Sequence, residues 1–219
     1  KNYSKNIFFE HNILGTINIL EYCVKNKVKK MIFVSSYVYG IPEKNPINEK
    51  QKVRPHNTYT KSKLLSEELC KSYAKKYKIE MIILRPFNIF GNLQKDDSLI
   101  SNIIKSIKNN TNIVVVNKNN KRDYLFIDDL IDAIIKLIDY KCEFEIFNIG
   151  SGKSYSFENV IQLFEKRTKK KIIKQYKISK KNNIPKIQVD ISKIKKEINW
   201  NPKYTLVEGI EKIILKNTK

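Results

Sequence analysis

Two side chains of this sequence, Tyr59 and Lys63, have the types and the spacing of a proton-transfer pair. A tyrosine and a lysine four residues apart lie on one face of a helix. A nearby ammonium group favours the phenolate, so a phenol with an ordinary pKa of ~10 can serve as a base near neutrality. Ser35, which follows the apolar residues 31–34, can bridge that base to a substrate hydroxyl.

The spacing of this pair is a weak signal by itself, because the chain is rich in lysine. The sequence has 12 tyrosines, and all but four of its 43 basic residues are lysine. Chance then gives roughly two Tyr-x-x-x-Lys matches, and a second pair does occur, Tyr176 with Lys180. No serine-bearing apolar segment precedes that second pair, so the context favours Tyr59 and Lys63.

The composition predicts a soluble protein with a real core. A chain of 219 residues, 41% of them hydrophobic, makes one large domain or two small ones. No apolar run approaches the ~20 residues of a membrane span, and no signal peptide is visible. Cys23, Cys70 and Cys142 are far apart and lack metal-ligand spacing. We therefore expect reduced thiols, no metal site, no membrane partner and a cytoplasmic location.

The net charge of +21 invites a nucleic-acid interpretation. Proteins that bind bases and phosphates favour arginine, because its guanidinium can donate two parallel hydrogen bonds. Arginine is nearly absent from this sequence. Lysines are spread along the whole chain, which is typical of solvated helix faces. Nucleic acid is therefore an unlikely main partner, although attraction to a phosphate-bearing substrate follows from the charge.

Hydrophobic periodicity and breaker residues predict helices that alternate with short apolar strands. This alternation favours a parallel sheet covered by helices on both faces. We expect helices at 6–26, 58–78, 97–109, 128–140, 157–168, 190–198 and 206–216, and strands at 31–36, 80–84, 112–116 and 144–149. No Gly-x-Gly-x-x-Gly or Gly-x-x-Gly-x-x-Gly phosphate loop occurs in the sequence.

Several segments, in this order, resemble one known family. They are Asn12–Thr16, Phe33–Gly40 (FVSSYVYG), Tyr59–Lys63, Leu84–Gly91 (LRPFNIFG), Lys121–Asp129 (KRDYLFIDD), Phe147–Gly152, Trp200–Pro202 and Leu206–Gly209. The chain is similar to the extended short-chain dehydrogenase/reductases, in particular to the UDP-glucose 4-epimerase-like members of the NAD-dependent epimerase/dehydratase group. The resemblance covers essentially the whole chain.

The resemblance implies an α/β fold: the C-terminal portion of a doubly wound, Rossmann-type parallel sheet with a smaller mixed α/β substrate lobe. Residues 1–92 would form a partial NAD-binding domain. Residues 93–219 would form mainly the substrate lobe, with segments around 112–150 returning to the Rossmann core. In this family a glycine-rich turn and the first strands precede the helix that opens this sequence. The resemblance therefore implies an exposed edge at the serine strand and an N-terminally truncated, inactive chain that binds NAD poorly by itself.

The resemblance also assigns catalytic roles in the complete enzyme. Tyr59 would be the general base, which removes a proton from a sugar hydroxyl as hydride passes to NAD. Lys63 would activate Tyr59 and hold the nicotinamide ribose. Ser35 would hold the reacting hydroxyl and relay its proton, although the adjoining Ser36 is an alternative for this role.

Binding residues follow from the same resemblance. Asn12 and Phe87 would contact the cofactor NAD, together with Tyr59 and Lys63. Asn88 and Arg122 would bind the diphosphate of a nucleotide-diphosphate sugar, for which a guanidinium is well suited.

The implied reaction is epimerisation at a sugar carbon, with C4 as the expected position. Dehydratases of the family carry an Asp-Glu pair after the catalytic hydroxyl residue, whereas this chain has Ser36-Tyr37. Alternatives are a nucleotide-sugar reductase or decarboxylase, or a non-catalytic basic Rossmann-like binding module. The resemblance further implies a homodimer through helices 6–26 and 57–78, and a place in polysaccharide biosynthesis.

Overall fold

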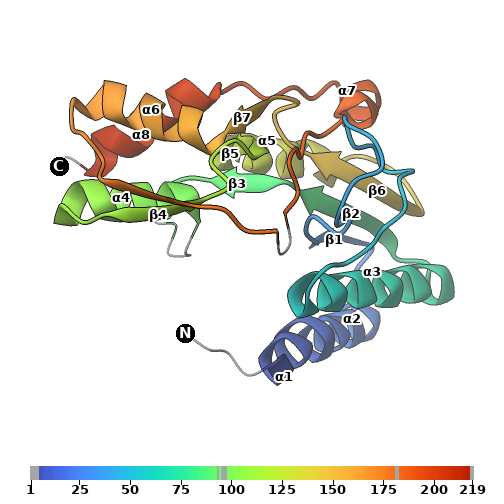
Figure 1. The fold of residues 1–219 in the computed structure, drawn as a ribbon. Helices are drawn as coiled ribbons and strands as arrows, with labels where there is room; N and C mark the ends of the chain where they lie inside the picture. The colour runs from blue at the N-terminus through green and yellow to red at the C-terminus, as the bar shows by residue number, and fades with distance from the viewer. Residues whose placement is uncertain (1–4, 93, 95–97, 181–182, 218–219) are drawn as a thin grey trace.

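A computed structural model describes residues 5–92, 94, 98–180 and 183–217 (Figure 1). Helices in this part are α1 (Lys5–Phe8), α2 (Gly15–Lys25), α3 (Thr58–Tyr77), α4 (Leu99–Asn109), α5 (Ile127–Ile138), α6 (Phe157–Thr168), α7 (Ser192–Ile198), α8 (Leu206–Asn217) and a π-helical segment η1 (Phe9–Leu14). Strands are β1 (Lys30–Val34), β2 (Glu80–Pro86), β3 (Asn88–Phe90), β4 (Ile113–Val116), β5 (Lys121–Phe126), β6 (Phe144–Ile149), β7 (Ser154–Ser156) and β8 (Lys174–Lys177).

The central sheet is parallel, in the order β1-β2-β6. Met81 and Ile83 of β2 pack against the helices α2 and α3, whereas Ile82 and Leu84 pack on the opposite face against α5. A strand that is buried on both faces consists of consecutive apolar residues. Residues 80–84 contain such a run, and for this reason they predict a strand. The α/β fold class with a Rossmann-type parallel sheet is confirmed.

Two smaller sheets accompany the central one. β5 pairs with β3 in parallel and with β7 antiparallel, and β4 pairs in parallel with β8. Helices α4, α6 and α8 cover a second core, which includes Phe126 and Phe164 (Figure 1). Of the segments between residues 112 and 150, β6 joins the central sheet, whereas β4 lies in the separate pair with β8. The division of domains at residue 92 stays a proposal.

The predicted helix at 6–26 contains the π-helical segment η1, which the sequence analysis does not foresee. Within this segment the carbonyl of Asn12 accepts hydrogen bonds from the hydroxyls of Thr16 (2.5 Å) and Ser66 (2.8 Å). These side-chain donors compete for a carbonyl that an α-helix would offer to the backbone, and such local changes of helix pitch are frequent at functional sites.

A capping box fixes the start of α3. The Asn57 side chain accepts from the backbone N–H of Thr60 at 2.8 Å, and the Thr60 hydroxyl accepts from the N–H of Asn57 at 3.3 Å. Two otherwise unpaired donors are satisfied in this way. Because the helix begins at Thr58, Tyr59 is held in its first turn.

β1 lies at an edge of the central sheet, since β2 is its sole strand partner among the described residues. The strand is apolar but only half-buried, and Val34 is 38% exposed. On α5, which also contacts β1, Ile131, Ile135 and Ile138 are each about half exposed. An unpaired parallel edge beside an exposed isoleucine stripe is a surface that globular proteins normally cover.

Candidate active site

The carboxyl ends of β1 and β2 lie side by side, and two predicted catalytic residues meet there. Ser35 directly follows β1, and its backbone N–H donates to the carbonyl of Leu84 in β2 at 2.7 Å. The Lys63 ammonium reaches in from α3 and donates to the carbonyl of Val34 at 3.0 Å. In open α/β sheets, ligands bind at this carboxyl edge. The structure therefore brings Ser35 and Lys63 to one strand end.

Tyr59 lies one helical turn before Lys63 on α3. Its side chain is 37% exposed, and its ring contacts the ring of Phe8 with 5.7 Å between centroids. The Tyr59 hydroxyl has no hydrogen-bond partner within the part of the chain that the structure describes. The phenol is thus open to a ligand, as a proton-transfer residue must be.

Lys63 is held in a partly apolar setting. Its ammonium lies over the ring of Phe33, 5.0 Å from the centroid. Burial lowers the pKa of the Lys63 ammonium, and the nearby Cys70 and Glu67 counteract part of that shift. An ammonium that has lost some of its water interacts more strongly with a neighbouring phenol than a solvated one does.

Ser35 belongs to a buried polar network. Its hydroxyl donates to the Glu67 carboxylate at 2.5 Å, and Arg85 binds the same carboxylate through Nε and Nη2, the shortest contact being 2.6 Å. Arg85 also donates to the hydroxyl of Tyr39 at 3.0 Å, which in turn donates to Asn148 at 2.7 Å. All five residues are buried. The Ser35 proton is therefore engaged by Glu67, and only the oxygen lone pairs of Ser35 remain available.

Phe87 follows β2 and is only 6% exposed. Its ring packs edge-on against the ring of Tyr37 at 5.3 Å and lies 6.5 Å from that of Tyr39. In this arrangement Phe87 presents little surface to a cofactor, and its predicted contact with the nicotinamide stays a proposal.

Asn88 and Arg122 line one cavity of about 170 Å³. Arg122 donates to the carbonyl of Ile184 at 2.7 Å, and its guanidinium lies 5.2 Å from the ring centroid of Phe157. Burial lowers the pKa of Arg122 from its ordinary value. A desolvated guanidinium beside an amide is an arrangement that favours phosphate.

Asn12, by contrast, faces α3. Its side-chain amide donates to the hydroxyl of Ser62 at 2.8 Å, and its carbonyl accepts from Ser66. These bonds fasten η1 to the helix that carries Tyr59. The predicted contact of Asn12 with the cofactor stays a proposal.

The competing pair, Tyr176 and Lys180, lacks the helical geometry that the chemistry needs. Tyr176 lies in β8, and its hydroxyl donates to Glu158 at 2.7 Å. The spacing of four residues places two side chains on one face only in a helix.

Four residues around the site were not predicted from the sequence as site residues. Glu67 and Arg85 form the ion pair beside Ser35, and the position of Glu67 one turn after Lys63 is a signal that could have revealed it. Tyr37 packs on Phe87, and its hydroxyl donates to the carbonyl of Gly40 at 2.6 Å. His56 has a pKa lowered by burial and by repulsion from Arg122, and no motif points to it.

Asp123 holds together three segments behind the Arg122 cavity. Its carboxylate accepts from the N–H of Ser151 at 2.7 Å, from the Ser151 hydroxyl at 2.8 Å and from the N–H of Val189 at 3.2 Å. Burial raises the pKa of Asp123 to about 6, although these hydrogen bonds oppose the rise.

This raised pKa predicts how stability depends on pH. In the unfolded chain an aspartate has a pKa of ~3.9, so the favourable contribution of protonated Asp123 is present below that value and is lost as the pH rises through the folded-state value. Relative to Asp123→Asn, which does not titrate, we expect the wild-type free energy of unfolding to fall by about 2–3 kcal/mol between roughly pH 4 and pH 7.5. Urea unfolding of both proteins at both pH values measures this difference. If the difference in the free energy of unfolding between the two proteins stays constant with pH, Asp123 does not have a raised pKa. Asp139→Asn, at an exposed position, is the matched control.

Among the described residues, no group of three or more His, Cys, Asp and Glu side chains is arranged to hold a metal ion. No helix in this part of the chain combines the length and the apolar character that crossing a bilayer requires.

Comparison with known proteins identifies the family. Residues 1–150 match the NAD dependent epimerase/dehydratase family. A putative UDP-glucose 4-epimerase from Methanocaldococcus jannaschii is 33% identical over 209 residues, which cover 93% of this chain and 68% of that protein. A dTDP-4-dehydro-6-deoxyglucose reductase from Escherichia coli is 30% identical and matches 93% of this chain and 66% of its own length. The chain therefore belongs to the NAD dependent epimerase/dehydratase family.

Solved structures agree with this assignment. The chain superposes with a TM-score of 0.88 on the UDP-glucuronic acid 4-epimerase from Bacillus cereus, solved with UDP-glucuronic acid and NAD. The two sequences are 26% identical, and the match covers 95% of this chain and 68% of the other. The chain thus spans about two thirds of the length of the relatives that it matches.

Proposed function

We propose that this chain carries the proton-transfer and substrate-binding part of an NAD-dependent nucleotide-sugar epimerase that acts at C4 of the sugar. The observation that carries the proposal is the partly exposed Tyr59, whose hydroxyl has no hydrogen bond among the described residues and which lies one turn before Lys63 at the carboxyl end of β1, in a chain of this family. When bound, NAD supplies the hydride acceptor that turns the alcohol into a ketone and the donor that reduces it again.

Tyr59 accepts the proton of the sugar hydroxyl and returns it after the ketone has been reduced on its other face. Lys63 stabilises the phenolate form in which Tyr59 accepts this proton, and its position beside the carbonyl of Val34 keeps it at the strand end where the sugar must lie. Lys63 reaches the strand end, and Tyr59 lies one helical turn before it, so the pair suits the nicotinamide end of NAD.

A sugar hydroxyl has a single proton, so Ser35 leaves that proton to Tyr59 when it holds the hydroxyl by donating a hydrogen bond to its oxygen. Because the Ser35 proton is engaged by Glu67, this donation, like a relay through Ser35, requires that the bond to Glu67 be broken first. The simpler path is a direct transfer of the hydroxyl proton to Tyr59.

Arg122 and Asn88 bind the diphosphate of the nucleotide sugar. Their cavity of about 170 Å³ is smaller than the roughly 300–1,000 Å³ of sites that enclose whole ligands, so it suits the diphosphate alone. The wider basic character of the chain attracts such a dianion.

We further propose that residues 1–219 do not bind NAD tightly by themselves. The sequence contains no glycine-rich phosphate loop, and the unpaired edge of β1 beside the exposed isoleucines of α5 is suited to pack against further parallel strands. Isothermal titration of the chain with NAD should therefore give no saturable heat in the micromolar range. Tight binding with one NAD per chain would contradict this view.

A nucleotide-sugar reductase is the second candidate, because the relative from Escherichia coli has that activity in its name. The two functions differ in redox balance. An epimerase returns the hydride to the same sugar and consumes no reduced cofactor, whereas a reductase oxidises one NADH or NADPH for each product.

The proposed enzyme is a cytoplasmic homodimer that contributes to polysaccharide biosynthesis. Cytoplasmic location is supported by three free cysteines, two of them buried. A dimer through α2 and α3 is supported by exposed apolar residues on these helices and on η1: Leu14, Ile19, Tyr22 and Leu65. Light scattering that finds only a monomer of the completed enzyme would rule the dimer out.

The activity is tested in a completed enzyme, made by joining the glycine-rich N-terminal region of a relative to this chain. This joined enzyme is loaded with NAD and assayed with UDP sugars that differ at C4.

A further inference from the structure

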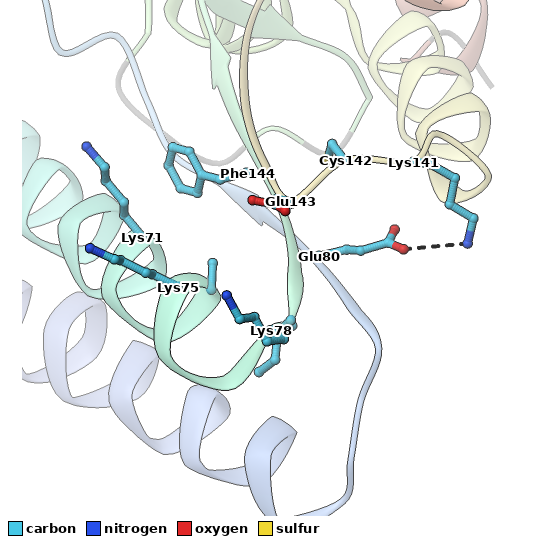
Figure 2. Close-up of a pocket in the computed structure, with 10 residues that line it drawn as sticks. Lys71, Lys75, Lys78, Glu80, Lys141, Cys142, Glu143 and Phe144 are labelled. Atoms are coloured by element: carbon cyan, nitrogen blue, oxygen red, sulfur yellow. Dashed lines mark ion pairs between the residues drawn. The ribbon is translucent and has the colours of Figure 1, made fainter.

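A second site lies at the opposite end of the central sheet from Tyr59. There the amino ends of β2 and β6 and the last turns of α3 surround a groove of about 590 Å³ (Figure 2). Its walls carry Lys71 and Lys75 of α3, Lys78 directly after α3, Lys141 and Cys142 before β6, and Phe144 at the start of β6. We call it the lysine groove. None of these residues belongs to the proposed active site.

The lysines of the groove form an uncompensated cluster of positive charge. Lys71 and Lys75 lie four residues apart on α3, so they share one face of the helix. Lys78 follows the end of α3 in a left-handed conformation and lines the same groove. Within the described residues none of the three has an ion pair. Like charges four residues apart destabilise a helix. A bound anion would relieve that repulsion.

The carboxylates of the groove do not cancel this charge. Glu80 pairs with Lys30 at 3.2 Å, outside the groove, and with Lys141 at 3.6 Å. Glu143 is exposed and is the other carboxylate that lines the groove. Because Lys30 already offsets Glu80, the groove keeps an excess of positive charge.

An aromatic and apolar wall faces the lysines. Phe144 lines the groove and is only half-buried, and Figure 2 draws its side chain among the lining residues. Ala74 and Ile79 also line the groove. Ala74, which has a small side chain, follows Lys71 by three residues on α3.

We propose that the lysine groove binds a nucleoside phosphate, with the base against Phe144 and the phosphate among Lys71, Lys75 and Lys78. Lysines bind phosphates as mobile point charges, and base–aromatic stacking tolerates any base. The volume lies within the range of small-ligand sites. An inorganic anion would leave the aromatic wall unused, and a neutral apolar ligand would leave the lysines unpaired.

Cys142 gives a local readout for this groove. Cys142 lines the groove and is partly exposed, with its thiol 3.8 Å from the carbonyl of Met81 and packed towards α5, whereas Cys23 and Cys70 are buried. Alkylation of residues 1–219 with iodoacetamide, followed by peptide mass spectrometry, reports the rate at Cys142 alone. Burial raises the pKa of the Cys142 thiol, so the reaction is run above pH 8. No turnover is needed, so failure here is separate from failure of the proposed epimerase.

We expect UMP or AMP to slow alkylation of Cys142 at least about tenfold at saturation, with half of the effect below about 1 mM. Lys71→Glu with Lys75→Glu should raise the concentration needed at least about tenfold. Phe144→Leu should weaken protection by the nucleotides. The same charge change at Lys195 and Lys196, both exposed on α7, is the matched control and should change protection less than about twofold.

Three results would overturn the proposal. One is no protection by either nucleotide at several millimolar. Another is equal protection by inorganic pyrophosphate at the same concentration, since the site would then be selective for anions only. The third is loss of protection in Arg122→Gln but not in the Lys71 and Lys75 variant, because the nucleotide would then act from the active site.

Discussion

Replacing Tyr59 by phenylalanine is expected to lower kcat of the joined enzyme about 10²- to 10⁴-fold, since the general base for the sugar hydroxyl is lost. Stability should change by less than about 0.5 kcal/mol, because the hydroxyl is exposed and unbonded among the described residues. The measurement is kcat at saturating UDP sugar, with the NAD content of each protein determined in parallel.

Tyr176→Phe is the matched control for this prediction. It removes the hydroxyl of the other tyrosine that has a lysine four residues later, on a strand of the separate two-stranded sheet β4-β8. We expect full activity from this variant. A Tyr59→Phe enzyme that keeps more than about a tenth of the wild-type kcat, with normal NAD content, would remove Tyr59 from the proposed role.

Replacing Glu67 by alanine is expected to reduce the free energy of unfolding by about 3–5 kcal/mol. The change leaves the Arg85 guanidinium, which is 5% exposed, without its carboxylate partner and takes away the acceptor of the Ser35 hydroxyl. Urea unfolding of residues 1–219, followed by circular dichroism, measures the loss.

The exposed ion pair of Arg54 with Glu43, at 2.6 Å, is the matched control. Glu43→Ala removes the same type of partner from a pair whose side chains are half exposed, so it should cost less than about 1 kcal/mol. The account also predicts that replacing Glu67 and Arg85 together, by leucine and methionine, recovers part of the loss, because no buried charge is left. Equal losses for Glu67→Ala and Glu43→Ala would contradict this view of the network.

The regular elements were predictable because their periodicity is strong. Residues 157–168 form a helix and residues 144–149 a strand with the predicted bounds. β3, β5, β7 and β8 were not foreseen. β3, β7 and β8 have only three or four residues, and none of them is an uninterrupted apolar run like β4. β5 begins with the charged residues 121–123, so it lacks the apolar pattern of a buried strand. The π-helical turn at Asn12 was missed for a different reason: it depends on the hydroxyl of Ser66, far along the chain.

The candidate site was predictable as a set of residues but not as a set of contacts. Motif order selected Tyr59, Lys63 and Ser35, and the structure places Lys63 and Ser35 at one strand end. The orientation of the Ser35 hydroxyl depends on Glu67, and the burial of Phe87 depends on Tyr37. Such pairings arise from tertiary packing, on which residue spacing gives no information.

We propose that this chain provides the catalytic residues of an NAD-dependent nucleotide-sugar epimerase. This proposal is tested by incubating the NAD-loaded joined enzyme with UDP-glucose, UDP-N-acetylglucosamine and UDP-glucuronic acid and separating the products by chromatography. We expect at least one of them to be converted to its C4 epimer, without net formation or consumption of NADH and only while Tyr59 is present. An NAD-loaded joined enzyme that epimerises none of them, or whose activity survives Tyr59→Phe, would contradict the claim.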